Sequence, residues 1–163
     1  MTISLNGRMD EQVYFVQATG QAALTGAAGD AAYVSMKGYD RATIIVDIHN
    51  GTTVTGTAIT LKQATAVAGT GEKELAYTRM LANTDVATSQ TMVETAVTSN
   101  TFTSNSTNSR RLRYIIEVEA NDLDVANGFD CLRVDGASGA NSTGQIAYIL
   151  WGAKYSGASP MAD

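Results

Sequence analysis

Alternation of apolar and polar residues with a period of two is the strongest pattern along the chain, and it predicts β-strands. In the segment 43–49, TIIVDIH, the even positions are apolar, while Asp47 and His49 fall on the other face. In 112–119, LRYIIEVE, the even positions are again apolar and most odd positions are charged. Such strands bury one face and leave the other largely in water. The segment 145–151, QIAYILW, is apolar in both phases, which indicates a central or covered strand.

Turn signals separate the weaker strand candidates. Asn50-Gly51 and Asn127-Gly128 each lie next to a strand candidate, and Asn-Gly is a strong signal for a short hairpin. Stretches rich in Gly, Ser, Asn and Thr predict longer loops at 99–109 and 136–144. Further strands, short or rich in β-branched residues, are expected at 12–17, 31–36, 53–63, 91–98 and 129–134.

Only two segments favour a helix. In 72–82, EKELAYTRMLA, the apolar residues are poorly spaced for one helical stripe. In 120–126, ANDLDVA, Asn121 or Asp122 can cap a single turn. Short strands with turns roughly every ten residues, and at most one or two short helical turns, predict an all-β fold. The expected architecture is a β-sandwich or a jelly roll.

The length of 163 residues suits a single domain. We expect the sandwich or jelly roll to occupy 13–155, with an N-terminal arm at 1–12 and a C-terminal tail at 156–163. An arm of this kind can add a strand to the edge of a partner's sheet.

The composition narrows the class of protein. Charged residues make up 17% of the chain, below the roughly 25% of ordinary soluble domains, and hydrophobic residues make up 44%, which argues against intrinsic disorder. The formal net charge of −5 argues against a nucleic-acid surface, which needs clustered cations. No apolar run approaches the roughly 18 residues of a membrane helix, and MTISLNGRMDEQ lacks the pattern of a signal peptide. We therefore expect neither nucleic acid nor membrane as a partner.

The sequence contains one cysteine and one histidine, and this limits the chemistry that it can perform. Cys131 excludes an internal disulfide, and its apolar neighbours in FDCLRV predict a buried structural thiol. His49 excludes every multi-histidine metal site, and without a G-x-S-x-G elbow it is expected to be a surface or strand-end histidine.

Acidic residues offer two further candidates. Glu117 and Glu119 share one strand face and form a carboxylate pair of the kind that glycoside cleavage uses, although such pairs are common on solvent-exposed strand faces. The run 122–128 resembles a calcium loop, but Ala126 stands at a ligand position and Arg133 stands where a bidentate Glu is required. A capped turn between strands is the preferred interpretation. We predict no enzymatic activity, no cofactor and no metal.

Two clusters are candidates for contact with a partner. The basic run RRLR at 110–113 is expected to pair with nearby carboxylates or with an acidic partner surface. The run VYFV at 13–16 is the best anchor cluster, because aromatic side chains dominate interface hot spots, and an ordinary first strand is an equal alternative. The candidate interface residues are Val13, Tyr14, Phe15, Val16, Arg110 and Arg111.

Several stretches carry a resemblance to a known family. They are MKGYDR at 36–41, TLKQA at 60–64, YIIEV at 114–118, LD at 123–124 and GFD at 128–130. Together with their surroundings, about 31–155, they resemble small head proteins of tailed bacteriophages that are encoded beside the major capsid protein. The resemblance implies a decoration, or cement, protein made in the bacterial cytoplasm and bound outside an icosahedral head. It further implies a jelly-roll-like or sandwich fold, a homodimer or homotrimer, and the major capsid protein as partner; it transfers no functional residues.

The predicted function is therefore to stabilise a capsid by bridging its subunits. A carbohydrate-binding or adhesin-like module is the main alternative, because β-sandwiches often carry sugars on their loops. Sugar sites usually need exposed aromatic platforms, and Trp151, the single Trp, lies in an apolar strand, which favours a core position. A tail-associated virion protein is a further alternative, and a β-rich hydrolase is the last.

Overall fold

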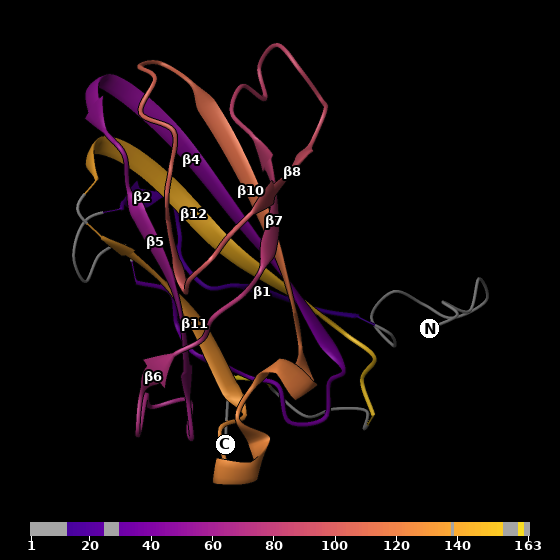
Figure 1. The fold of residues 1–163 in the computed structure, drawn as a ribbon. Helices are drawn as coiled ribbons and strands as arrows, with labels where there is room; N and C mark the ends of the chain where they lie inside the picture. Colours follow the sequence, from indigo (N-terminus) through magenta and orange to yellow (C-terminus); the bar gives the residue numbers. More distant parts are fainter. Residues whose placement is uncertain (1–12, 25–29, 138, 155–159, 162–163) are drawn as a thin grey trace.

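The computed structural model describes residues 13–24, 30–137, 139–154 and 160–161. Strands hold 53% of these residues and short 3-10 turns hold 4%. The strands form two antiparallel sheets packed as a single β-sandwich (Figure 1). The predicted all-β, single-domain fold is confirmed. No helix in the described part of the chain combines the length and the apolar character that crossing a membrane requires.

Within the described residues, the larger sheet has seven strands and the smaller has five. In spatial order the larger sheet contains β1 (Val13–Gln17), β12 (Ala140–Trp151), β4 (Arg41–Thr55), β10 (Arg111–Glu119), β7 (Arg79–Asn83) and β8 (Val93–Ala96), with β2 (Ala22–Ala23) also paired to β12. The smaller sheet contains β3 (Val34–Ser35), β11 (Cys131–Ala137), β5 (Ala58–Ala64) and β6 (Lys73–Glu74), with β9 (Thr101–Thr103) also paired to β5.

The core lies between the sheets and follows the predicted alternation. Ile44, Val46 and Ile48 of β4 face inward and are buried. The even-numbered residues of β10, and those from 146 to 150 in β12, do the same. They pack with Leu61 of β5 and Leu132 of β11 in one apolar cluster. Burying one such side chain contributes about 1.5–3 kcal/mol, so this alternation is the main source of the fold's stability.

Of the two segments that favour a helix in the sequence, only one contains helical turns. The segment 72–82 is not helical, because it contributes β6 and β7 to different sheets. The segment 120–126, where a single turn was expected, contains one 3-10 turn, η2 (Ala120–Asp122), and the start of a second, η3 (Val125–Asn127). The Asp122 carboxylate accepts a hydrogen bond from the Glu119 amide at 2.8 Å and so caps the first turn.

The hairpin expected at Asn50-Gly51 is wrong. β4 runs through both residues to Thr55, and the next strand, β5, belongs to the other sheet. Asn50 is fully buried, and its Nδ2 donates to the carbonyl oxygens of Asn105 at 2.8 Å and Thr107 at 2.9 Å. Gly51 lies against the chain at Asn141, where a Cβ would approach the carbonyl oxygen to 2.9 Å. Both residues serve tertiary packing instead of a two-residue turn.

The long loop expected at 136–144 is also wrong, because β11 continues to Ala137 and β12 begins at Ala140. Gly144 fits a crowded place in β12, where a Cβ would lie 2.6 Å from the Asp47 carbonyl oxygen. The loop expected at 99–109 contains β9. Gly128 has a φ of 81° and ends η3, so Asn127-Gly128 forms a turn between two sheets, not a hairpin.

The expected arm, 1–12, and most of the expected tail, 156–163, lie outside the described residues. Pro160 is described and buried, and its carbonyl oxygen accepts a hydrogen bond from the Ser35 amide at 2.7 Å. This point of the tail therefore contacts β3 of its own domain.

Candidate interaction surface

One face of the larger sheet points away from the core, and we call it the outer face. It is formed by the odd-numbered residues of β1, β12, β10 and β7, and by those from 41 to 49 in β4. The register aligns these residues in rows across the sheet. Strands about 4.8 Å apart and rows about 6.6 Å apart give the outer face roughly 600 Å².

The centre of the outer face is apolar. Its middle row begins with the polar Gln17 on β1 and continues through four apolar residues, Ala147, Ile45, Ile115 and Leu81. All four are half-buried, because large neighbours on adjacent strands shield them in part. Alternation places these residues outside the sandwich. The core therefore does not require them to be apolar.

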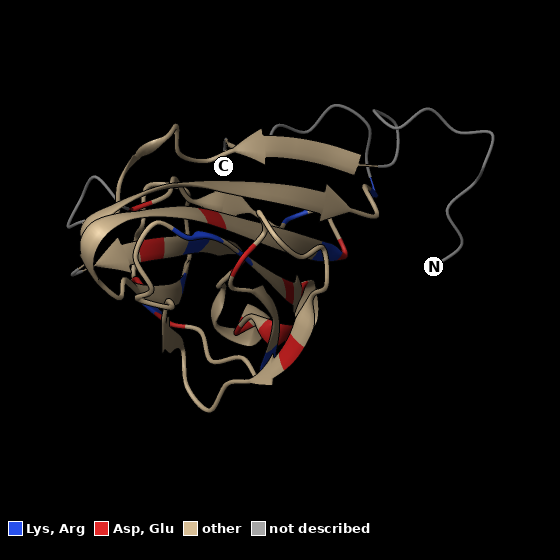
Figure 2. Ribbon diagram, turned by 90° about the horizontal axis from the view of Figure 1, so that it is seen from above, with Lys and Arg blue, Asp and Glu red and all other residues tan. Residues whose placement is uncertain are grey.

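At one edge the apolar row joins a partly exposed cluster, which we call the aromatic corner: Val13, Phe15, Ile149 and Trp151. Phe15 is 62% exposed. The Trp151 Nε1 donates to the Thr43 hydroxyl at 2.9 Å, and the Arg41 guanidinium lies 5.6 Å from the Trp151 ring centre. Neither β1 nor β12 carries a charged residue, so the charges in Figure 2 lie on other elements.

The core position expected for Trp151 is wrong. Ile146, Tyr148 and Leu150 fill the core, so the intervening residues of β12, Trp151 included, face outward. Trp151 is half-buried beside Arg41 instead of enclosed between the sheets.

The structure divides the predicted anchor cluster between the two faces of β1. Val13 and Phe15 pair with Trp151 and Ile149 and point outward. Val16 is buried in the core at 7% exposure. Tyr14 shares its inward phase at the sheet edge and remains 42% exposed. Only Val13 and Phe15 therefore contribute to the outer face.

The basic run lies at the far end of the outer face. Arg110 forms an ion pair with Asp85, and Arg113 binds the Asp47 carboxylate through two contacts of 2.6 and 2.9 Å. The expected pairing with carboxylates is confirmed for these two arginines. Arg111 points outward opposite His49, which is exposed as expected. Basic run and aromatic corner, far apart in the sequence, thus share one surface.

The predicted carboxylate pair also lies on the outer face. Glu117 and Glu119 are both exposed and line a hollow of about 300 Å³ with Arg41 and Arg79. The Glu117 carboxylate lies 3.9 Å from each of these guanidinium groups. These contacts are therefore weak ion pairs at the rim of the outer face.

The run 122–128 has its carboxylate oxygens engaged within the chain. Asp124 forms an ion pair with Lys73, and the Asn127 side chain donates to both Asp124 oxygens at 2.8–2.9 Å. The Lys73 contact, followed by the Asn127 contact, lowers the pKa of Asp124. The capped turn preferred over a calcium loop is what the structure contains. No group of three acidic, His or Cys side chains suited to a metal occurs within the described ranges.

Cys131 is buried on β11, and its Sγ donates to Asp130 Oδ1 at 3.2 Å. The prediction of a buried thiol is confirmed.

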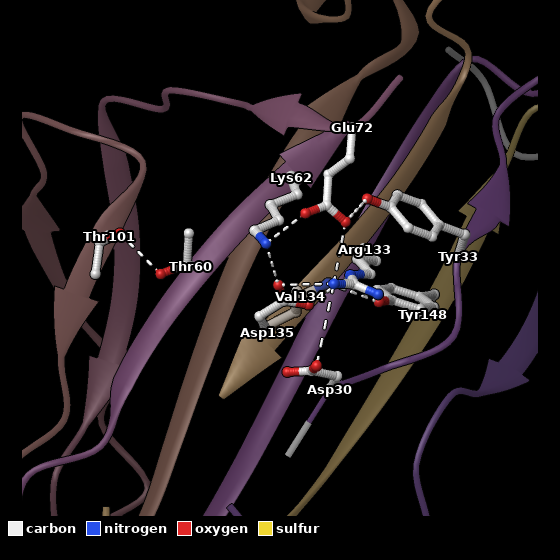
Figure 3. Close-up of polar contacts among 10 residues, drawn as sticks. All are labelled: Asp30, Tyr33, Thr60, Lys62, Glu72, Thr101, Arg133, Val134, Asp135 and Tyr148. Atoms are coloured by element: carbon white, nitrogen blue, oxygen red, sulfur yellow. Dashed lines mark hydrogen bonds and ion pairs between the residues drawn. The ribbon is translucent and has the colours of Figure 1, made fainter. Parts of the chain in front are cut away.

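A cluster of ion pairs on the smaller sheet was not predicted from the sequence (Figure 3). Lys62 Nζ lies 2.6 Å from Glu72 Oε1 and 2.8 Å from Asp135 Oδ2. Arg133 contacts Glu72 at 3.0 Å and Asp135 at 2.5 Å, and the Tyr33 hydroxyl donates to Glu72 at 2.6 Å. Glu72 precedes β6, whereas its partners lie on β5, on β11 and beside β3, so it fastens the β5–β6 connection to the sheet.

We expect Glu72→Gln to lower the free energy of unfolding by about 1 kcal/mol at pH 7, the upper range for a partly exposed ion pair. Hydrogen bonds from Lys62 and then Tyr33 lower the pKa of Glu72 below its ordinary 4.5. A lowered folded-state pKa gives stability that is present above the unfolded-state pKa and lost as the pH falls through the folded-state pKa. The difference between variant and wild type, measured by urea denaturation, therefore shrinks below about pH 4.5.

Glu74→Gln is the matched control, since Glu74 is exposed on β6 opposite Lys62 and forms no ion pair with the described residues. The Glu74→Gln variant should change the free energy of unfolding little, both at pH 7 and below about pH 4.5. A Glu72→Gln loss that stays constant down to pH 3 contradicts the ion-pair explanation.

No protein-family model, no curated protein and no solved structure matches the chain. Its class rests on its own geometry: a β-sandwich domain whose larger sheet presents an apolar centre, an aromatic corner and a charged rim on one outer face.

Proposed function

We propose that this chain is a structural protein of a tailed-bacteriophage particle, bound to the outside of an icosahedral head. There it bridges subunits of the major capsid protein, as a homodimer or homotrimer, and stabilises the shell. The outer face carries this proposal, because an apolar centre with an exposed aromatic side chain, Phe15, and a charged rim is typical of protein–protein contacts. The family resemblance of the sequence supplies the identity of the partner.

The physical requirements of such a role match this surface. DNA packed in a head exerts outward pressure, and a protein that spans two subunits opposes it through contact area alone. A standard interface buries about 800 Å² on each partner, close to the roughly 600 Å² of the outer face. Many copies on one shell act together, so each contact need not be strong.

One observation favours a second candidate, a carbohydrate-binding module. Trp151 and Phe15 lie at the aromatic corner and not in the core, and aromatic rings at a surface can stack on sugar rings. The Arg41 guanidinium beside Trp151 leaves Phe15 as the more open ring. A tail-associated virion protein would use the outer face in the same manner as a head protein.

We expect Phe15→Ala to weaken binding to purified heads about 30-fold, the result of losing a hot spot worth about 2 kcal/mol. Phe15 points outward, so the melting temperature should stay nearly unchanged. Binding is measured by co-sedimentation of the purified protein with heads that lack it.

Val93→Ala is the matched control, because Val93 is 60% exposed on β8, the opposite edge strand of the same sheet. It should bind heads as the wild type does. Equal binding by Phe15→Ala and wild type contradicts a contact through the aromatic corner. Glycan-array binding that disappears in Phe15→Ala, without any binding to heads or tails, establishes the carbohydrate module instead.

A further inference from the structure

A hollow of about 390 Å³ lies at the far end of the outer face from the aromatic corner, and we call it the basic trough. Its floor consists of two neighbouring rows of the sheet. One row is Thr143, His49 and Arg111, and the other is Gln145, Asp47 and Arg113. Its size falls within the range of sites that hold small groups or side chains.

The backbone around the basic trough is held firmly in place. The Val86 amide donates to the Arg111 carbonyl oxygen at 2.9 Å, and the Asn50 amide donates to the Arg110 carbonyl oxygen at 2.9 Å. The ion pair between Arg110 and Asp85 fixes the segment that carries Val86, which lines the trough. The backbone of Arg111 is therefore fixed, so binding has to order only its side chain.

The charges in the basic trough do not cancel. Asp47 is occupied by Arg113 in a two-point ion pair. Arg111 has no carboxylate partner among the described residues. In a chain with a formal net charge of −5, the arginines of the trough thus outnumber its carboxylates by one, with the polar side chains of His49, Thr143 and Gln145 beside them as hydrogen-bonding groups.

We propose that the basic trough binds a carboxylate side chain on an acidic segment of the protein that the outer face contacts. A guanidinium presents paired N–H donors that match the two oxygens of a carboxylate, so Arg111 is the principal contact. Thr143 and Gln145 offer further hydrogen bonds from the floor. This inference rests on the proposed function, and it specifies the charge that the capsid surface must present at this end of the outer face.

A carboxylate fits the trough better than a nucleic-acid backbone does. Nucleic acids bind through several cations that each neutralise one phosphate. Among the residues described at the trough only Arg111 is uncompensated, and the exposed Glu117 and Glu119 farther along β10 repel an extended polyanion. One short acidic segment meets the single cation without approaching those carboxylates.

The test uses the full chain and three probes: purified heads, a short fluorescein-labelled polyglutamate peptide and a single-stranded oligonucleotide. We expect Arg111→Glu to weaken binding to heads about tenfold and to abolish the anisotropy change with the peptide. Arg111→Lys should retain part of the binding, because it keeps the positive charge but loses the paired N–H donors of the guanidinium. Lys37→Glu is the matched charge reversal, on an exposed lysine in the turn before β4.

The outcomes separate this inference from the proposed function. Peptide binding that needs Arg111 but not Lys37 supports the trough even if wild-type protein fails to bind heads, which overturns the proposed function alone. Equal head binding by wild type and a folded Arg111→Glu, together with no peptide binding, overturns the trough and leaves the proposed function standing. Tighter binding of the oligonucleotide than of the peptide also overturns the trough.

Discussion

Replacing Tyr148 with alanine is expected to lower the free energy of unfolding by about 3–5 kcal/mol, the usual cost of removing a buried aromatic side chain. Tyr148 is fully buried on β12, and its hydroxyl accepts a hydrogen bond from the Val134 amide at 3.0 Å. The side chain thus connects the larger sheet with β11 of the smaller one. Its removal leaves a cavity and a buried amide without an acceptor, and domains of this size have only about 5–15 kcal/mol in total.

Tyr148→Phe separates the two contributions, because it keeps the ring and removes only the hydroxyl. The loss should be about 1–3 kcal/mol, the cost of a buried donor left unpaired. Both variants are compared with wild type by urea denaturation, with an unchanged m-value as the sign that the unfolding transition is the same. A loss below about 1 kcal/mol in Tyr148→Ala contradicts the position of this ring between the sheets.

Replacing Asn50 with aspartate is expected to cost about 3–5 kcal/mol near pH 7, because it buries a charge without a cation. In the wild type the Asn50 amide donates to two carbonyl oxygens and its Oδ1 accepts from the Ser142 hydroxyl at 3.1 Å. A carboxylate in that place faces the two carbonyls with no proton to donate. Burial and this repulsion raise the folded-state pKa of the new aspartate above its unfolded value of about 3.9.

The pH dependence of the Asn50→Asp loss has a definite sign. A raised folded-state pKa means that the native state binds the proton more tightly, so the variant is least destabilised below about pH 4 and loses stability as the pH rises. Asn50→Ala is the control, since it removes the same hydrogen bonds without adding a titrating group. Thermal melts from pH 3 to pH 8 measure both variants, and parallel curves for the two contradict a buried carboxylate.

The strands with clear alternation could be predicted from sequence because one rule decides them. In 43–49 and 112–119 every even residue is apolar, and burial between two sheets follows directly. The same rule, applied to 145–151, would have placed Trp151 outside the core, since Tyr148 and Leu150 hold the other phase. In this segment both the inward-facing and the outward-facing residues are apolar. Only the pairing with β1 shows the reason, because the outward-facing residues lie beside Phe15.

Local turn signals failed where distant chain segments use the same residues. Asn50-Gly51 has the composition of a hairpin turn, but the Asn50 amide satisfies carbonyls more than fifty residues away in the chain. Gly144 reads as part of a loop, yet it is needed where two strands and Leu24 crowd together. Such contacts depend on sheet topology, which no local window contains.

Only part of the candidate surface could be predicted from the sequence. The two clusters chosen for partner contact do share the outer face, but alternation along β1 sends Tyr14 and Val16 the other way. The ion pairs around Arg133 needed the register of β11 against β5, which sets Arg133 opposite Lys62. The phase shared by Arg133 and Asp135 in the sequence was the one signal for that cluster.

The direct pairing of Val13 with Trp151 has a practical consequence for display of foreign polypeptides. β1 begins and β12 ends at this corner of the larger sheet, so a cargo inserted directly before β1 or directly after β12 lies beside Phe15 and obstructs docking. An insertion into the exposed turn at 68–71, which joins β5 and β6 in the opposite layer, keeps that corner accessible. Under the proposed function, particles that carry cargo there are expected to load fully, whereas insertions beside β1 or β12 compete with attachment.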